Sequence, residues 1–158
     1  MAKLKIERLD HQGRGIAYLD NKIVFVENAL PEEIVEVEII EENKTYSTAI
    51  VKKYEEISKD RIEPICPYYE KCGGCKLQHL SYENTLKYKQ EKIKNIFERN
   101  QIDIPEINII KNDSPENYRN KLSLRIVDGK FGFYEEKSHN LIEIKNCSIA
   151  KESINKFL

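Results

Sequence analysis

The sequence predicts an α+β protein in which a small OB-like β-barrel is followed by a four-cysteine loop, a helix and an antiparallel sheet. Residues 1–55 alternate apolar and polar residues with the period of two that is typical of strands. Residues 81–100 repeat apolar residues at helical spacing, and residues 105–147 return to the strand pattern. Three of the four cysteines fall between the first two regions, within residues 66–75.

The composition indicates a soluble globular protein. The chain has 158 residues, a net charge of -1 and 34% charged residues, enough for one domain or two small ones. It has neither an apolar run long enough to cross a membrane nor the apolar core of a signal peptide. We therefore expect a cytoplasmic monomer with no membrane partner, whose cysteines stay reduced and serve as ligands rather than disulfides.

The two parts of the chain differ only slightly in net charge. Residues 1–55 carry 8 Lys/Arg and 11 Asp/Glu, whereas residues 56–158 carry 18 and 16. A nucleic-acid-binding protein often has a net basic surface, and this chain does not. Any such contact must therefore come from local basic patches.

Residues 1–56 are expected to form the barrel domain. Leu4 and Ile6 face one side of a first strand, and Val35 and Val37 alternate with glutamates in a later one. About five short strands in this length suit a small closed barrel. Such barrels bind nucleic acid through basic and aromatic side chains on one face. The candidates here are Arg14, Lys44 and Tyr46, with ordinary solvated surface as the alternative.

A polar linker over residues 57–65 leads to a second domain, residues 66–158, which opens with the cysteine loop. The candidate metal ligands are Cys66, Cys72, Cys75 and the distant Cys147. The pair Gly73-Gly74 is expected to let the backbone turn tightly, because glycine tolerates positive φ. Zinc and iron-sulfur clusters both accept four thiolates. The three-plus-one grouping favours a cluster, while zinc and unligated buried thiols remain open.

Ser81 is expected to cap a helix that ends near Asn100, with the hydroxyl accepting from free backbone N–H groups. Its apolar face should pack on an antiparallel sheet over residues 105–147. Asp128-Gly129 predicts a hairpin turn in that sheet, and its last strand should lead to Cys147. Another helix is expected to begin within residues 151–158.

Several polar residues near the cysteines are candidate nucleic-acid contacts. His79 follows the loop and could donate to a cluster sulfur, contact RNA or simply lie at the surface. Lys121 and Arg125 should share one face of a strand, with Arg119 close by, and such residues position a phosphate backbone without reading its sequence. No dinucleotide fingerprint, phosphate loop or Ser/His/Asp set is present, so no catalytic or cofactor-binding residue is assigned.

The motifs together resemble the RNA uracil-5-methyltransferase family. The resemblance lies in Cys66-Pro67, Cys72-Gly73-Gly74-Cys75 and Gln78-His79, which are similar to that family's iron-sulfur signature. Upstream, Gly13–Ala17, Val24–Val26 and Ala29–Pro31 resemble its TRAM domain. Downstream, Tyr118–Lys121, Gly132–Tyr134 and Ser138-His139 resemble its central domain, which then leads to Cys147.

The resemblance implies that this chain is the N-terminal part of a methyltransferase that modifies C5 of a uridine, in 23S ribosomal RNA more than in transfer RNA. It also implies a 4Fe-4S cluster on the four cysteines, whose role is structural or RNA-positioning. The nucleophilic cysteine, the base and the S-adenosylmethionine domain of the family lie beyond this sequence, so the central domain is expected to be incomplete and the chain inactive alone. The alternative function is a non-catalytic RNA-binding module with a structural metal site.

Overall fold

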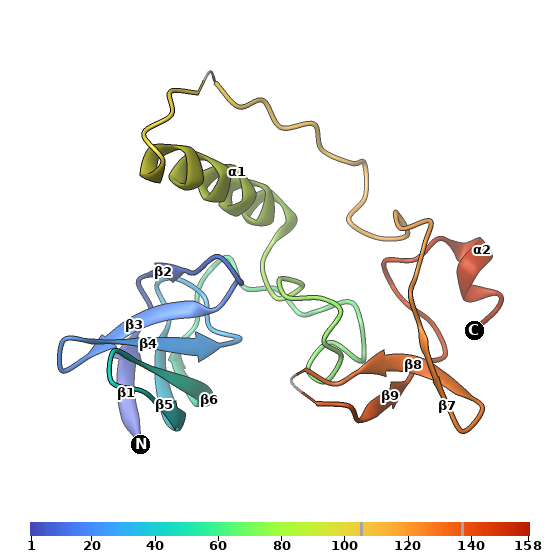
Figure 1. Cartoon of the computed structure of the whole chain (residues 1–158), viewed down its shortest axis with the longest axis horizontal. Helices are drawn as coiled ribbons and strands as arrows, with labels where there is room; N and C mark the ends of the chain where they lie inside the picture. Colours follow the sequence, from blue (N-terminus) through green and yellow to red (C-terminus); the bar gives the residue numbers. More distant parts are fainter. Residues whose placement is uncertain (105, 137) are drawn as a thin grey trace. The chain divides into compact units, whose positions relative to one another are not determined.

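The computed structural model describes residues 1–104, 106–136 and 138–158 and is mostly β with few helices. Pro105 and Lys137, which belong to the region predicted as a sheet, lie outside the described residues. The chain forms two compact units: Met1–Ile62 with His79–Pro105, and Glu63–Gln78 with Glu106–Leu158 (Figure 1). None of the helices in the described parts of the chain combines the length and hydropathy needed to span a bilayer.

The described first unit contains a six-stranded sheet in the order β1-β5-β6-β4-β3-β2. Neighbouring strands are antiparallel except β4 and β6, which run parallel. The strands are β1 (Ala2–Lys5), β2 (Arg8–Leu9), β3 (Gly15–Leu19), β4 (Lys22–Glu27), β5 (Ile34–Glu42) and β6 (Tyr46–Glu56).

Residues 2–9 close this sheet into a barrel, because they pair with both of its ends. β1 pairs with β5, and the Ile6 N–H extends that ladder by donating to the Glu33 carbonyl at 2.9 Å. One residue later the chain changes partner, and the Glu7 N–H donates to the Ile16 carbonyl at 2.9 Å before β2 pairs with β3. The N-terminal β domain predicted from the sequence is therefore present.

As the sequence predicts, the apolar side chains that alternate along the strands fill the interior of the barrel. Ile6, Val35 and Val37 are fully buried, whereas Ile40 points outward and is half exposed. Gly15 is required by a close approach, because a Cβ there would lie 2.9 Å from the Ile6 Cγ2 atom and 3.0 Å from the Ala29 carbonyl.

Helix α1 (Tyr82–Arg99) belongs to the first unit, whereas the sheet on which the sequence predicts it to pack belongs to the second. Polar bonds attach it: the Tyr88 hydroxyl donates to the Asp10 carbonyl and the Lys92 Nζ donates to the His11 carbonyl, both at 2.7 Å. Ser81 is the N-cap residue, but its hydroxyl accepts from the Asn84 side chain at 3.0 Å rather than from a backbone N–H.

The second unit is built on the antiparallel sheet β7-β8-β9, formed by β7 (Arg125–Val127), β8 (Lys130–Tyr134) and β9 (Leu141–Glu143), and contains the short helix α2 (Glu152–Asn155). Asp128 and Gly129 have φ values of 49° and 77° and form the predicted hairpin turn. β7 begins only at Arg125, whereas the alternating pattern starts at Leu122. Leu122 and Leu124 instead pack against a small core that contains Ile144 and Cys147.

Candidate metal centre

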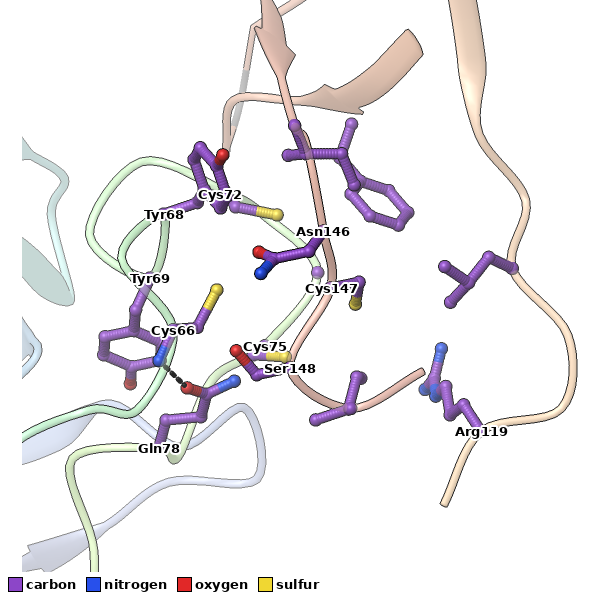
Figure 2. Close-up of a pocket in the computed structure, with 15 residues that line it drawn as sticks. Cys66, Tyr68, Tyr69, Cys72, Cys75, Gln78, Arg119, Asn146, Cys147 and Ser148 are labelled. Carbon is purple, nitrogen blue, oxygen red and sulfur yellow. Dashed lines mark hydrogen bonds between the residues drawn. The ribbon is translucent and has the colours of Figure 1, made fainter. Parts of the chain in front are cut away.

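The four cysteines lie around one small pocket in the second unit. Figure 2 shows the sulfur atoms of Cys66, Cys72, Cys75 and Cys147 on different sides of it, with Asn146 between them. All four are free thiols, and the residues that line the pocket also include Tyr68, Phe133 and Ile149. The four thiols therefore line one pocket, although no three His, Cys, Asp or Glu side chains among the described residues are arranged to hold a single metal ion.

Backbone bonds fold the loop that carries the first three cysteines. The Tyr69 N–H donates to the Cys66 carbonyl at 3.1 Å, and the Cys72 N–H donates to the Tyr68 carbonyl at 2.8 Å. The Gly73 N–H then donates to the Tyr134 carbonyl of β8 at 3.2 Å. The sheet of the same unit thus fixes the end of the loop.

Gly73 and Gly74 do not serve the loop in the predicted way, because neither has a positive φ in the described structure. Space is the physical reason for them. A Cβ on Gly73 would lie 3.3 Å from the Tyr134 carbonyl oxygen, and one on Gly74 would lie 3.4 Å from the Cys72 sulfur. A larger residue at position 73 would therefore press on β8, whereas one at position 74 would meet the Cys72 sulfur at about ordinary contact distance.

Cys147 lies in a turn shortly after β9, close to where the sequence places it. Asn155 of helix α2 holds this turn at both sides of the cysteine: the Cys147 N–H donates to the Asn155 Oδ1 at 2.8 Å, and the Asn155 Nδ2 donates to the Cys147 carbonyl at 3.1 Å. The Lys145 N–H also donates to the Tyr68 hydroxyl at 3.1 Å, which joins this segment to the loop. The sequence pattern singles out neither Asn155 nor Tyr68.

Burial favours the protonated form of Cys72 and Cys75 as long as no cation is bound. Burial is the main cause that raises the pKa of Cys72 and of Cys75, and the neighbouring thiols raise both further. The Gly74 N–H lowers the pKa of Cys72, and a hydrogen bond from the Gln78 side chain lowers that of Cys75, without reversing the rise. A bound metal would supply the positive charge needed to displace these protons.

The three basic candidates of the second unit occupy different settings. Arg119 lines the cysteine pocket, and its backbone N–H donates to the Ile149 carbonyl at 2.8 Å. The Arg125 guanidinium lies 5.5 Å from the centre of the Tyr134 ring. Lys121 precedes β7, so one strand does not place it beside Arg125 as the period of two predicts.

Two of the three barrel candidates, Arg14 and Tyr46, lie at one aromatic ring. The Arg14 guanidinium lies 4.2 Å from the centre of the Phe25 ring, and Tyr46 meets the same ring edge-on at 5.6 Å. Arg14 is also paired with Asp10 at 2.7 Å, and therefore holds its own loop. Lys44 is exposed between β5 and β6.

His79 belongs to the first unit and is buried, with only 2% of its surface exposed. A side chain so enclosed presents no surface to RNA, so the expected contact is not supported by its position. Burial and the nearby Arg61 charge lower the pKa of His79 to about 4, although the Glu33 carboxylate acts in the opposite direction. The imidazole is therefore neutral at pH 7.

Known proteins resemble this chain along nearly its whole length. The TRAM domain model matches residues 3–52. An uncharacterized RNA methyltransferase of Listeria monocytogenes (strain F2365) is 40% identical over 95% of this chain and 34% of its own length. The 23S rRNA (uracil(1939)-C(5))-methyltransferase RlmD of Shewanella amazonensis is 37% identical over 98% of this chain and 37% of its own length.

A solved structure shares the fold. The Pyrococcus abyssi tRNA (uracil-54, C5)-methyltransferase, in complex with S-adenosyl-L-homocysteine, matches with a TM-score of 0.72 and 24% identity, over 98% of this chain and 34% of its own. These relatives and this solved structure are RNA methyltransferases. Within that class, the chain belongs to the RNA uracil-5-methyltransferase family. It spans about a third of the length of these relatives.

Proposed function

We propose that this chain is the RNA-binding and metal-binding portion of an S-adenosylmethionine-dependent RNA (uracil-C5)-methyltransferase, acting on 23S ribosomal RNA rather than transfer RNA. Residues 1–56 are the TRAM domain, residues 57–65 a linker and residues 66–158 part of a central domain. The convergence of four thiols on one pocket carries the proposal, because this set of donors is the one that the family resemblance requires.

The four cysteines suit a 4Fe-4S cluster better than a single zinc ion. Tetrahedral zinc with Zn–S bonds of about 2.3 Å requires thiolates only about 3.8 Å from one another. The grouping of three cysteines in one loop with a fourth far along the chain supports the cluster. A cluster takes each cysteine thiolate on a different iron and therefore accepts a wider set of donors.

The cluster would supply structural cross-linking, since methyl transfer to a uridine requires no electron from the protein. Cys66, Cys72 and Cys75 would then be tied to Cys147, which otherwise connects to them through packing and the Tyr68 hydrogen bond. The residues of this chain would hold and orient the RNA through Lys44 and Tyr46 in the first unit and Arg119, Lys121 and Arg125 in the second. Residues beyond this chain would bind S-adenosylmethionine and react with the base.

The metal content of the chain tests the proposed centre. After purification without oxygen, we expect iron and inorganic sulfide in the ratio of one four-iron cluster, with the broad visible absorption of such clusters. Serine in place of Cys66, Cys72, Cys75 or Cys147 should abolish both, because each thiolate is a ligand. Ser148→Ala, which alters a hydroxyl group in the same pocket, is the control and should retain the iron. Zinc without sulfide would contradict the cluster.

Methyl transfer tests the substrate, and it requires the full-length protein that contains these residues. We expect the radiolabelled methyl group of S-adenosylmethionine to appear at C5 of uridine in a 23S rRNA transcript and not in transfer RNA. Labelling of transfer RNA alone would overturn the ribosomal assignment. Labelling of neither RNA by a cluster-loaded protein would favour a non-catalytic binding module.

A further inference from the structure

Cys147 is the one candidate ligand that does not belong to the cysteine loop. Cys66, Cys72 and Cys75 share that folded loop, whereas Cys147 comes from a separate stretch of backbone at the same pocket (Figure 2). A cluster takes one thiolate on each iron. The proposed centre therefore depends on how firmly the second stretch of backbone presents Cys147.

The side-chain amide of Asn155 binds both backbone polar groups of Cys147. The Cys147 N–H donates to the Asn155 Oδ1 at 2.8 Å, and the Asn155 Nδ2 donates to the Cys147 carbonyl at 3.1 Å. The same Nδ2 donates to the Ala150 carbonyl at 3.4 Å, and the Ala150 N–H closes the turn by donating to the Cys147 carbonyl at 2.9 Å. One half-buried amide thus joins both ends of the turn that carries the fourth thiol.

Asn155 is itself held beside this turn. Its backbone N–H donates to the Lys151 carbonyl at 3.2 Å. Ile154 and Leu158, which lie on either side of it in the sequence, pack against the small core that contains Cys147. An anchored stretch of backbone therefore presents the amide, which can orient Cys147 before any metal binds.

The chemistry of a carboxamide suits this position. It offers an acceptor and a donor on one plane, whereas a carboxylate only accepts and an alanine does neither. Asn155 can therefore pair with the N–H and the carbonyl of one residue at the same time. Residues behind the ligands of a metal site fix the orientation of those ligands, and loss of such residues weakens metal binding.

We propose that Asn155 is a positioning residue of the metal centre, which holds the backbone of Cys147 so that the thiolate is presented to the cluster. This inference rests on the proposed cluster, which the four thiols of the pocket would hold. Its consequence is a centre that retains iron longer than it would with a loosely held fourth ligand.

Two substitutions separate the two halves of the amide. Asn155→Ala removes all of its hydrogen bonds, and it does not weaken helix α2 by propensity because alanine is the best helix former. Asn155→Asp can still accept from the Cys147 N–H but cannot donate to the carbonyls. Asn140→Ala is the matched control, because it removes an asparagine amide of the same unit whose Nδ2 donates to Glu135 at 3.0 Å.

The experiment has two measurements on the 158-residue chain. The first, without metal, is the rate at which iodoacetamide alkylates each cysteine, identified by mass spectrometry. We expect Asn155→Ala to accelerate alkylation of Cys147 several-fold and to leave the other three cysteines unchanged, because the turn opens more often. The second is iron release to a chelator from the chain loaded with iron and sulfide. It should be several-fold faster in Asn155→Ala, less so in Asn155→Asp, and unchanged in Asn140→Ala.

Three results would overturn the role of Asn155: equal acceleration of alkylation at all four cysteines, iron release from Asn155→Ala at the rate of the unchanged chain, or Asn140→Ala behaving like Asn155→Ala. An unchanged chain that takes up neither iron nor sulfide would overturn the proposed cluster as well. The two failures are therefore distinguishable. If Asn155→Ala does not fold, the near-isosteric Asn155→Asp still decides, since unchanged alkylation of Cys147 and unchanged iron release would contradict the role.

Discussion

His79 illustrates how one residue gains a different role once its surroundings are known. From the sequence it stands directly after the cysteine loop, so a place beside the metal or the RNA is a natural expectation. In the structure His79 belongs to the first unit, where its carbonyl accepts a hydrogen bond from the Ile62 N–H at 3.0 Å. Burial, which the sequence does not reveal, turns the imidazole into a neutral core side chain.

The lowered pKa of His79 predicts a loss of stability in mild acid. The folded pKa of about 4 lies below the ordinary value of 6.5, so the unfolded chain binds the proton more tightly. The contribution of neutral His79 is therefore fully present above pH 6.5 and is lost as the pH falls through 4. From pH 7 to pH 5 the free energy of unfolding should fall by about 2 kcal/mol through this residue.

Urea denaturation at a series of pH values measures this effect. His79→Gln should remove that part of the pH dependence, because glutamine does not titrate. His11→Gln, at an exposed histidine of the same unit, is the control and should leave the dependence unchanged. An equal slope in the unchanged chain and in His79→Gln would contradict the prediction.

At the scale of elements, a buried ion pair joins the start of β5 to the segment that follows β6. Glu33 is fully buried and accepts two hydrogen bonds from the Arg61 guanidinium, at 2.6 and 2.8 Å. Its carboxylate also accepts from the Leu30 N–H at 2.8 Å and the Ser58 N–H at 3.3 Å. Arg61 in turn covers the Tyr54 ring at 4.6 Å. The acidic and linker patterns of the sequence do not predict this network, because its partners lie far apart in the chain.

Removal of the Glu33 carboxylate should destabilise the first unit strongly. Glu33→Ala leaves the Arg61 charge and two backbone N–H groups without their acceptor, and breaking a buried pair in this way costs about 3–5 kcal/mol. A lower midpoint of urea unfolding, followed by circular dichroism, is the expected result. Glu38→Ala removes an exposed carboxylate paired with Lys52 and should leave the midpoint unchanged. Equal midpoints for the two variants would contradict this account.

For the whole molecule, period-two alternation and turn residues were sufficient to predict the strands of the barrel and the hairpin, because each depends on neighbours in sequence. Ile6 and Val37 are buried and Asp128-Gly129 forms the turn, as predicted. The assignment of α1 to the first unit depends on Tyr88 and Lys92, whose backbone partners lie near residue 10. Such polar contacts produce no periodic pattern in the sequence. For the same reason the hydrogen bond from the Cys147 N–H to Asn155 could not be predicted.

Residues 2–9, which close the barrel, also have a consequence for the order in which the barrel can be completed during synthesis. This segment leaves the ribosome before either of its partners, and its pairing with β5 must wait until residues 34–37 have emerged. β1 is thus paired only after the hairpin of β3 and β4 has had the opportunity to form from contacts between close neighbours. Until β5 arrives, the nascent chain presents an unpaired strand segment whose apolar face contains Leu4 and Ile6.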